Sequence, residues 1–130
     1  MTIIDTTVMI ALLKGSPNVV EKINELLDQN DRITITIITA YELLKGAYLS
    51  SRQQENLIDV TEAISNLQVL DLSPGACEEA ADIYCELKES GKLIGEFDIL
   101  IAAIAKTNGE AILTHDQHFK SIRGLDLIKW

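Results

Sequence analysis

The chain begins Met1-Thr-Ile-Ile-Asp-Thr-Thr-Val-Met-Ile10, and this stretch decides how the rest of the sequence is interpreted. Ile3 and Ile4 predict a short apolar strand that stops at Asp5, and the residues that follow predict the start of a helix. A carboxylate at the carboxyl end of a buried strand is costly unless it is paired or binds a metal ion. In open α/β sheets, ligands gather at this end of the strands. The position of Asp5 therefore raises the question of whether other acids are directed at the same point.

Strands and helices are predicted to alternate along the chain, because stretches with a two-residue period alternate with stretches of helical period. Strands are expected at residues 3–5, 32–36, 67–72, 111–114 and 125–129. Helices are expected at residues 7–13, from 17 onwards, and at 37–49, 51–66, 74–90, 97–106 and 116–122. This order predicts a parallel sheet of four to five strands, with right-handed crossovers and helices on both faces. The chain is therefore expected to form a single three-layer α/β/α domain over residues 1–130.

Two of the predicted helices carry specific expectations about burial. The nearly all-apolar stretch from 97 to 106 is expected to be buried on most sides. In the amphipathic helix at 51–66, the residues expected to face the core are Leu57, Ile58, Val60, Ala63 and Ile64.

Composition excludes several classes of protein. A length of 130 residues fits one domain, and an apolar content of 47% with few aromatic residues suits an aliphatic α/β core. The net charge of −9 gives no general attraction to nucleic acids or anionic membranes. The longest apolar run is too short to span a bilayer, and no signal peptide is expected because Asp5 interrupts the N-terminal apolar stretch. Cys77 and Cys85 are too far apart along one helix for a disulfide, and two free thiols favour the cytoplasm.

Four acids occupy positions that a solvated helix face does not explain, namely Asp5, Glu42, Asp98 and Asp116. Each has an ordinary interpretation, the aspartates as helix N-caps and the glutamate as a partner of Lys45 one turn away. As a set, however, three of them lie just beyond predicted strands, and Asp98 opens the most apolar helix. Parallel strands present their carboxyl ends on the same side of the sheet. The four carboxylates are therefore expected to converge in a cleft.

Converging carboxylates repel one another strongly. A single like-charged pair at about 4 Å costs about 4 kcal/mol at an effective dielectric constant of 20. Such a site must hold a cation or keep protons on some of its carboxyl groups. Ligands that are all oxygen favour Mg²⁺ or Mn²⁺ over zinc or copper. The sequence therefore predicts a magnesium or manganese site.

With these residues placed, the chain resembles the PIN-domain ribonucleases and, within them, the VapC-type toxins of toxin–antitoxin pairs. The resemblance runs nearly end to end, and its specificity comes from several motifs in order rather than from any one of them. The motifs are Ile-Ile-Asp5-Thr-Thr, Thr39-Ala-Tyr-Glu42-Leu-Leu-Lys-Gly46, Glu96-Phe-Asp98-Ile-Leu-Ile-Ala-Ala103, Ile112-Leu-Thr114-His-Asp116-Gln-His-Phe119 and the closing Ile122-Arg-Gly-Leu-Asp-Leu. The four acids fall on the family's acidic positions, and Thr114 falls on its usual Ser/Thr position. His115 stands where many relatives carry Arg or Asn, and Asp116 is Asn in some relatives.

The resemblance implies a Mg²⁺- or Mn²⁺-dependent endoribonuclease with a PIN-like fold. It also implies a homodimer and a small antitoxin that inserts a segment into the active-site groove. The RNA targets of such toxins are commonly structured, such as tRNA or ribosomal RNA. Exposed apolar residues on the helix from Tyr41 to Leu49 would then form a dimer or antitoxin surface, with core packing as the ordinary alternative.

The expected roles follow from this chemistry. Asp5 and Asp98 are the expected direct metal ligands, and Glu42 and Asp116 would complete the shell or take a proton from the attacking water. Thr6 and Thr114 are expected to orient the carboxylates, with Thr6 as the support of Asp5. The basic residues that would hold flanking phosphates, or merely solubilise the surface, are Lys14, Lys45, Arg52, Lys92 and His115.

Four alternatives from other classes remain open. A phospho-accepting receiver domain needs an acidic pair at the end of the first strand, where this chain has only Asp5. A haloacid-dehalogenase-type phosphatase needs Asp-x-Asp, and the second position here is Thr7. A histidine-based ribonuclease using His115 and His118 would work without metal and leave cyclic phosphates. The last alternative is an inactive PIN-like binding module.

Overall fold

The computed structural model describes residues 1–128 and residue 130, and a sheet of five parallel strands lies at its centre. The strands are β1 (Thr2–Ile4), β2 (Ile33–Thr36), β3 (Gln68–Leu70), β4 (Ala111–Leu113) and β5 (Leu127–Ile128). Their spatial order is β3-β2-β1-β4-β5, so the first strand of the chain is the central one. Ile3 pairs with Thr34 on one side and Ile112 on the other. The predicted parallel sheet is confirmed, and Lys129, the predicted last residue of β5, lies outside the described residues.

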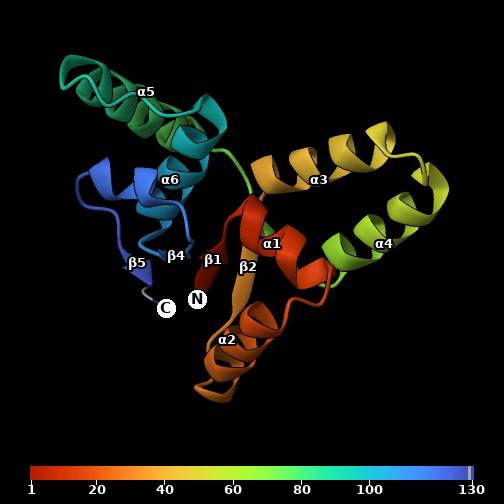
Figure 1. Ribbon diagram of the computed structural model, residues 1–130. Coiled ribbons are helices and arrows are strands. Elements are labelled where there is room, and N and C mark those ends of the chain that lie inside the picture. Colours follow the sequence, from red (N-terminus) through yellow and green to blue (C-terminus); the bar gives the residue numbers. More distant parts are fainter. Residues whose placement is uncertain (129) are drawn as a thin grey trace.

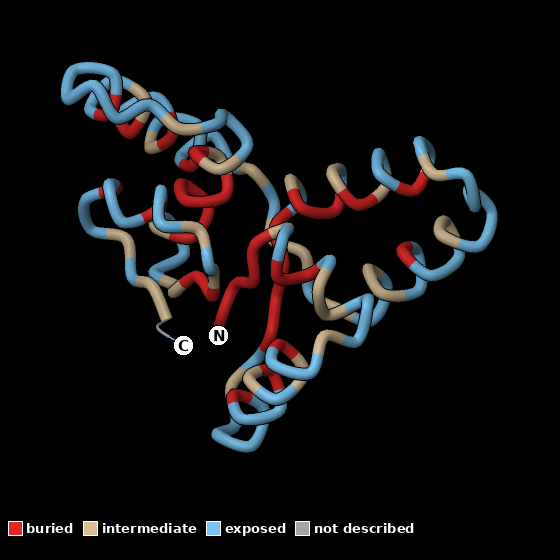
Figure 2. The backbone as a smooth tube through the Cα atoms, viewed as in Figure 1, coloured by how far each residue is buried: buried red, intermediate tan, exposed pale blue. Residues whose placement is uncertain are grey.

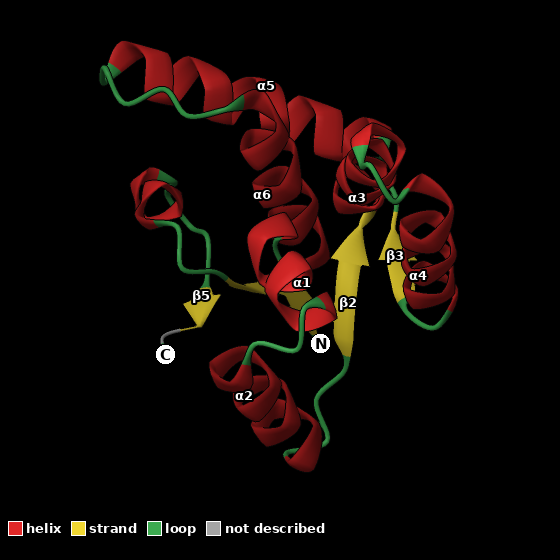
Figure 3. Cartoon of the chain, turned by 45° about the vertical axis from the view of Figure 1, so that its right-hand side comes forward, coloured by secondary structure: helices red, strands yellow, loops and turns green. Residues whose placement is uncertain are grey.

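Helices cover both faces of this sheet (Figures 1 and 3). The helices are α1 (Thr6–Leu13), α2 (Pro17–Asp28), α3 (Ile37–Leu49), α4 (Gln53–Ser65), α5 (Pro74–Glu89), α6 (Glu96–Asn108) and the 3₁₀ helix η1 (Gln117–Ser121). Residues from α1 to α4 pack into one hydrophobic core, and residues from α5, α6 and η1 pack into a second. The predicted three-layer α/β/α architecture is therefore confirmed.

The alternation of β1 and β4 side chains divides the interior into these two cores. Ile4 and Leu113 contribute to the core beneath α1–α4, whereas Ile3 and Ile112 contribute to the core beneath α5 and α6. All four side chains are fully buried, and in Figure 2 the central strands are accordingly buried along their length. Strands that are buried on both faces are typical of parallel sheets, and they explain why Ile3 and Ile4 are consecutive apolar residues.

The helix α6 is buried as predicted, whereas α4 differs from expectation at one position. In α6 the buried residues are Ile99, Ile101, Ala102, Ala103, Ile104 and Ala105. In α4, Ile58 is 66% exposed, so the expectation that it faces the core is wrong. The helix packs against α3 as the second arm of a helical hairpin (Figure 1), so it is covered along a narrow stripe that includes Val60 but not Ile58.

The segment predicted as a helix at 116–122 is a short 3₁₀ helix rather than an α-helix. Within the described part of the chain, no helix is both long enough and apolar enough to cross a membrane.

The topology places the candidate acids at one edge of the sheet. Asp5 directly follows β1, and Thr114 directly follows β4. Because α3 starts at Ile37 without a break after β2, its first turns also lie at that edge and carry Glu42. The helix α6 leads back to the amino end of β4, so its first turn, with Asp98, lies at the carboxyl edge as well.

Candidate active site

Asp5 is the most buried of the four acids, with 4% of its surface exposed. Its Oδ1 atom accepts a hydrogen bond from the backbone N–H of Val8 (2.8 Å), so the residue caps α1 as its ordinary interpretation predicts. Its Oδ2 atom accepts a hydrogen bond from the hydroxyl of Thr114. Burial raises the pKa of Asp5, and the nearby charge of Asp116 acts in the same direction, while the two hydrogen bonds oppose the shift. The residue is therefore a helix cap whose second oxygen is turned toward β4.

Thr114 connects two of the acids across the sheet edge. Its hydroxyl donates to Asp5 and accepts from the backbone N–H of Asp116 (2.9 Å). The Oδ1 atom of Asp116 accepts the backbone N–H of His118 at 2.8 Å and lies 3.0 Å from the Nδ1 atom of the same residue. Asp116 therefore caps η1, and Thr114 lies where the sequence analysis expects a residue that orients a carboxylate.

Glu42 is held by Thr6, which is a correction to the expected arrangement. The Thr6 hydroxyl donates to Oε1 of Glu42 at 2.7 Å and lies 3.0 Å from the hydroxyl of Thr39. The expectation that Thr6 supports Asp5 is therefore wrong. The Asp5 carboxylate is turned toward β4 and its own helix, whereas the next side chain faces α3, which packs against α1.

The ordinary interpretation of Glu42 as a partner of Lys45 also differs from the structure. Among the described residues no ion pair joins these two side chains. The Nζ atom of Lys45 lies instead 5.3 Å from the ring centre of Tyr41 and 5.1 Å from that of Phe97.

Asp98 shows that the four acids share one electrostatic environment. Desolvation and the charges of Asp116, Glu42 and Asp5 together raise the pKa of Asp98 to about 6, while the charge of His118 opposes the shift. The carboxylates expected from the sequence to converge are thus close enough to repel one another.

The four carboxylates nevertheless do not surround a single position closely enough to form a complete set of metal ligands. In the described part of the chain, no three side chains of Asp, Glu, His or Cys are placed to hold a metal ion. The donor set still fits a hard divalent cation, because it consists of carboxylate oxygens whose mutual repulsion a cation would relieve. The site is therefore best described as four acids in one region. Thr114 links the Asp5 carboxylate to the backbone of Asp116, and Thr6 holds the Glu42 carboxylate.

A ring stack that the sequence analysis did not single out lies beside this site. The imidazole of His115 stacks on the indole of Trp130, with ring centres 3.9 Å apart and planes inclined by 24°. The charge of His115 acts to lower the pKa of Asp5, so the imidazole is near the buried carboxylate. Three other basic residues are expected from the sequence to contact phosphates. The Nη1 atom of Arg52 lies 3.8 Å from Oε2 of Glu55 in an exposed ion pair, and Lys14 and Lys92 are exposed.

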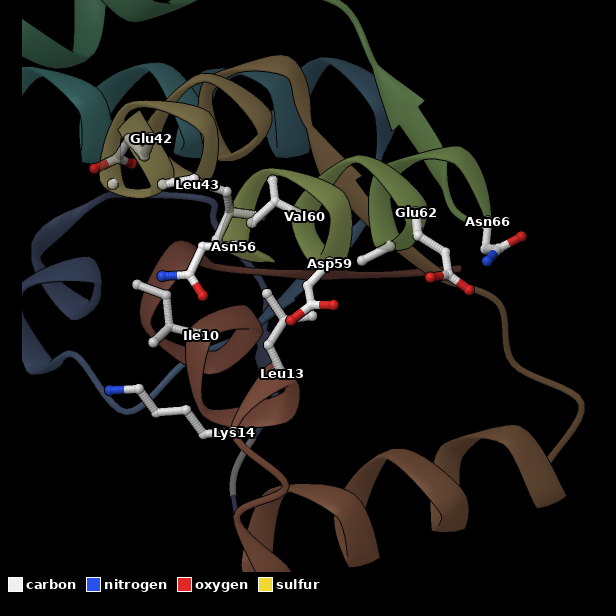
Figure 4. Close-up of a pocket in the computed structure, with 13 residues that line it drawn as sticks. Ile10, Leu13, Lys14, Glu42, Leu43, Asn56, Asp59, Val60, Glu62 and Asn66 are labelled. Carbon is white, nitrogen blue, oxygen red and sulfur yellow. The ribbon is translucent and has the colours of Figure 1, made fainter. Parts of the chain in front are cut away.

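A groove between α1, α3 and α4 leads to Glu42 (Figure 4). Its volume is about 740 Å³. It is lined by Ile10, Leu13, Lys14, Glu42, Leu43, Gly46, Ala47, Asn56, Asp59, Val60, Glu62, Ala63 and Asn66. Ile10 and Leu13 face the groove from α1, while Val60 and Asn56 face it from α4. Because Glu42 belongs both to the groove wall and to the acid set, an occupant of the groove would reach the candidate active site.

Comparison with known proteins gives concordant results. The family model described as "PIN domain" matches residues 2–125. The chain is 30% identical to Ribonuclease VapC2 of Haemophilus influenzae, over 98% of this chain and 96% of that protein. It is 33% identical to the tRNA(fMet)-specific endonuclease VapC of Salmonella typhimurium, again over 98% of this chain and 96% of that protein.

Solved structures agree in fold along almost the whole chain. The structure of VapBC2 from Rickettsia felis bound to a DNA fragment from their promoter has a TM-score of 0.89 at 27% identity, covering 99% of this chain and 98% of that one. The structure of VapBC-1 from nontypeable Haemophilus influenzae has a TM-score of 0.88 at 28% identity, covering 99% of this chain and 97% of that one.

The raised pKa of Asp98 predicts how stability depends on pH without metal. In the folded state the pKa of this carboxyl group is about 6 rather than its usual 3.8, so its favourable contribution to stability is present below pH 3.8 and is lost as the pH rises through 6. In the presence of a chelator, Asp98→Asn should therefore raise the melting temperature at pH 7.5, and this gain should shrink toward pH 4. Thermal unfolding followed by circular dichroism at both pH values measures the difference.

Asp82→Asn is the matched control, because Asp82 lies on the exposed face of α5. It should leave the melting temperature nearly unchanged at both pH values. An Asp98→Asn variant that is no more stable than the unmodified protein at pH 7.5 would contradict the repulsion inferred for the four acids.

Proposed function

The chain belongs to the PIN-domain family, whose model matches nearly all of it, and we propose that it is a metal-dependent endoribonuclease of the VapC type, the toxin of a toxin–antitoxin pair. The observation that carries this proposal is that acids from separate segments meet at one edge of the sheet, where the Thr114 hydroxyl contacts Asp5 and the backbone of Asp116 and the Thr6 hydroxyl holds Glu42. Helix capping accounts for Asp5 and Asp116 one at a time, but it does not account for four carboxylates in one region, because their repulsion opposes folding. They fit a site for a divalent cation that acts on a phosphodiester.

We assign the metal to Mg²⁺ or Mn²⁺, held by Asp5 and Asp98 with Glu42 and Asp116 completing its surroundings. When bound, such an ion reverses the local negative charge, lowers the pKa of a water molecule and stabilises the in-line transition state. Thr114 orients the Asp5 carboxylate through its hydroxyl and accepts the backbone N–H of Asp116, which positions that residue beside Asp5. Because the Oε1 atom of Glu42 is held by Thr6, its Oε2 atom is the one available to take the proton of the attacking water, with Asp116 as the alternative base.

The products follow from the attack of water on the phosphorus atom, in line with the 3′ oxygen. Water adds to phosphorus, the bond from phosphorus to the 3′ oxygen breaks, and the departing oxygen takes up a proton. Cleavage therefore leaves 5′-phosphate and 3′-hydroxyl ends. A histidine mechanism would leave cyclic phosphates, and the two candidate rings are engaged separately, His115 with Trp130 and His118 with Asp116.

We propose structured RNA as the substrate class, with tRNA as the first choice. The chain is 32% identical to a protein of Shigella flexneri and 33% identical to one of Salmonella typhimurium, both named tRNA(fMet)-specific endonuclease VapC. Ribosomal RNA is the second choice. The net charge of −9 means that RNA binding depends on the metal and on specific contacts rather than on general attraction.

We propose that the groove between α1, α3 and α4 receives a segment of the cognate antitoxin. The groove has apolar side chains along its walls and includes Glu42 in its lining. A segment bound in it would therefore be held by apolar contacts and would block access to the active site. Similar structures include VapBC complexes. Exposed side chains near the end of α3, Tyr48 at 62% and Leu49 at 81%, offer a surface for the expected homodimer. The free, exposed thiols of Cys77 and Cys85 support a cytoplasmic location.

The proposed function is tested by incubating the purified protein with total RNA, with and without Mg²⁺. We expect cleavage that needs the metal, stops with EDTA and yields 5′-phosphate ends when the cut sites are mapped. Asp5→Asn should reduce the rate by at least about a hundredfold and still fold, because the amide oxygen retains the cap of α1. Its circular dichroism spectrum and melting curve provide the check on folding. Activity that survives EDTA, or an Asp5→Asn variant with full activity, would overturn the assignment.

The groove assignment is tested by placing a charge in its wall. Ile10 is 39% exposed and Leu13 is 41% exposed, so Ile10→Lys and Leu13→Lys should be tolerated by the fold. We expect each to weaken binding of the cognate antitoxin by about tenfold or more, because a lysine ammonium resists desolvation in an apolar contact. Metal-dependent cleavage without antitoxin should persist.

Leu27→Lys is the matched control, since Leu27 is 48% exposed on α2 outside the groove. Isothermal titration calorimetry with the cognate antitoxin measures the affinities of all three variants. Equal affinity of the groove variants and the control would show that the antitoxin binds elsewhere.

A further inference from the structure

Two aromatic rings and a lysine form a cluster that the mechanism above does not use. Tyr41 on α3 and Phe97 on α6 meet edge to face, with ring centres 5.7 Å apart and planes inclined by 81°. The Nζ atom of Lys45 lies 5.3 Å from the first ring centre and 5.1 Å from the second. Tyr41 is 52% exposed and Phe97 is 38% exposed. We call these three residues the aromatic cluster.

The cluster lies at the rim of the acid site. Tyr41 immediately precedes Glu42, and Phe97 immediately precedes Asp98. Consecutive residues of a helix project about 100° apart, so each helix turns its acid toward the sheet edge and its ring away from it. The edge-to-face contact bridges α3 and α6, the two helices that supply these acids. The two rings therefore lie next to two of the four acids, on the outer side of the helices that carry them.

Exposure of these rings is not explained by packing. Phenylalanine and tyrosine are few in this chain, with two and three copies, and the second phenylalanine, Phe119, is 1% exposed in the core. Exposing a large ring to water gives up the favourable free energy of burying it. The two rings at the rim therefore retain a surface that a partner would cover.

We propose that the more exposed ring, Tyr41, stacks on an unpaired base of the RNA substrate next to the scissile phosphate, that the perpendicular ring of Phe97 contacts the edge of this base, and that Lys45 binds a phosphate flanking it. This inference rests on the ribonuclease activity proposed above. Every base has a face that stacks on an aromatic ring, whereas a base inside an A-form duplex is not accessible to it. Lys45 has three N–H donors. Its contacts with the two rings do not use these donors in hydrogen bonds to oxygen, so the ammonium can bind phosphate oxygens.

The charge of the protein strengthens this choice of partner. At a net charge of −9, the surface offers no general attraction for RNA, so a large share of the binding free energy must come from contacts that do not depend on charge. Base stacking supplies such a contact. The cluster thereby selects for RNA segments that are single-stranded at the cut, such as loops.

The first test measures steady-state cleavage of a short single-stranded RNA that contains a mapped cut site. We expect Tyr41→Ala and Phe97→Ala to raise KM by about tenfold with little change in kcat. Tyr41→Phe and Phe97→Tyr keep a ring and should retain the original KM. Ile58→Ala is the matched control, because Ile58 on α4 is a large apolar side chain that is 66% exposed and lies outside the aromatic cluster and the groove.

Salt dependence separates the rings from the lysine. Lys45→Gln should make the dependence of log KM on log salt concentration shallower, because one phosphate contact is removed. The ring variants should raise KM without changing that slope. Equal slopes for Lys45→Gln and the unmodified protein would overturn the phosphate contact.

The second test removes the base instead of the ring. A set of RNAs with a single abasic nucleotide at successive positions around the cut should reveal one position where the unmodified protein loses about tenfold in kcat/KM. For Phe97→Ala or Tyr41→Ala, the abasic substitution at that position should cause little further loss, because ring and base form one interaction. Additive losses would overturn the stacking proposal.

The outcomes distinguish this inference from the proposed function. An unmodified protein that cleaves no RNA contradicts the ribonuclease assignment itself. Normal cleavage with an unchanged KM in the alanine variants contradicts only the aromatic cluster. Should these variants keep their KM but alter the oligomeric state measured by light scattering, the rings belong to a contact between two copies of the chain, and the inference is wrong. Melting curves exclude unfolding as the cause of a raised KM.

Discussion

The burial of a carboxylate at the end of the central strand is the constraint on which the rest of this structure depends. Asp5 is almost completely covered, and an ionised carboxylate in that position is tolerated only if donors surround it. The donors come from two directions, the first turn of α1 and the residue after β4. Both the start of α1 and the strand that pairs beside β1 are therefore fixed by the same side chain. The carboxyl edge of the sheet becomes a polar site within an otherwise aliphatic fold.

Two threonine hydroxyls organise the acids around this point. One joins the acids that follow β1 and β4, and the other ties Glu42 on α3 to the first residue of α1. Asp98 stands apart from these links, and its surroundings are defined by burial and by the charges of the other three. A site built in this way opposes its own folding in the absence of a cation. Local conflict of this kind is expected at functional sites, which natural proteins retain at the expense of stability.

Much of this arrangement could be predicted from the sequence, because strand ends and helix starts fix where a residue lies along an element. The parallel three-layer fold and the position of the four acids at one edge followed from that periodicity. Side-chain direction was harder to predict. Thr6 follows Asp5 in the chain, yet its hydroxyl donates to Glu42. Hydrogen bonds between different helices depend on rotamers and helix packing, which the spacing of residues along the sequence does not determine. The contact between Tyr41 and Phe97 links distant segments, so no local pattern could have revealed it.

The position of β1 at the centre of the sheet has a consequence for the order in which the molecule is completed. This strand is the first to be synthesised, yet β4, one of its two neighbours, is among the last. The bond between Thr114 and Asp5 spans 109 positions, so it forms only after β4 has left the ribosome. Contacts of such long range close late in folding. A nascent or truncated chain that stops before β4 therefore holds Asp5 and Glu42 without Asp116, and the four acids come together only after β4 and the residues that follow it have been synthesised.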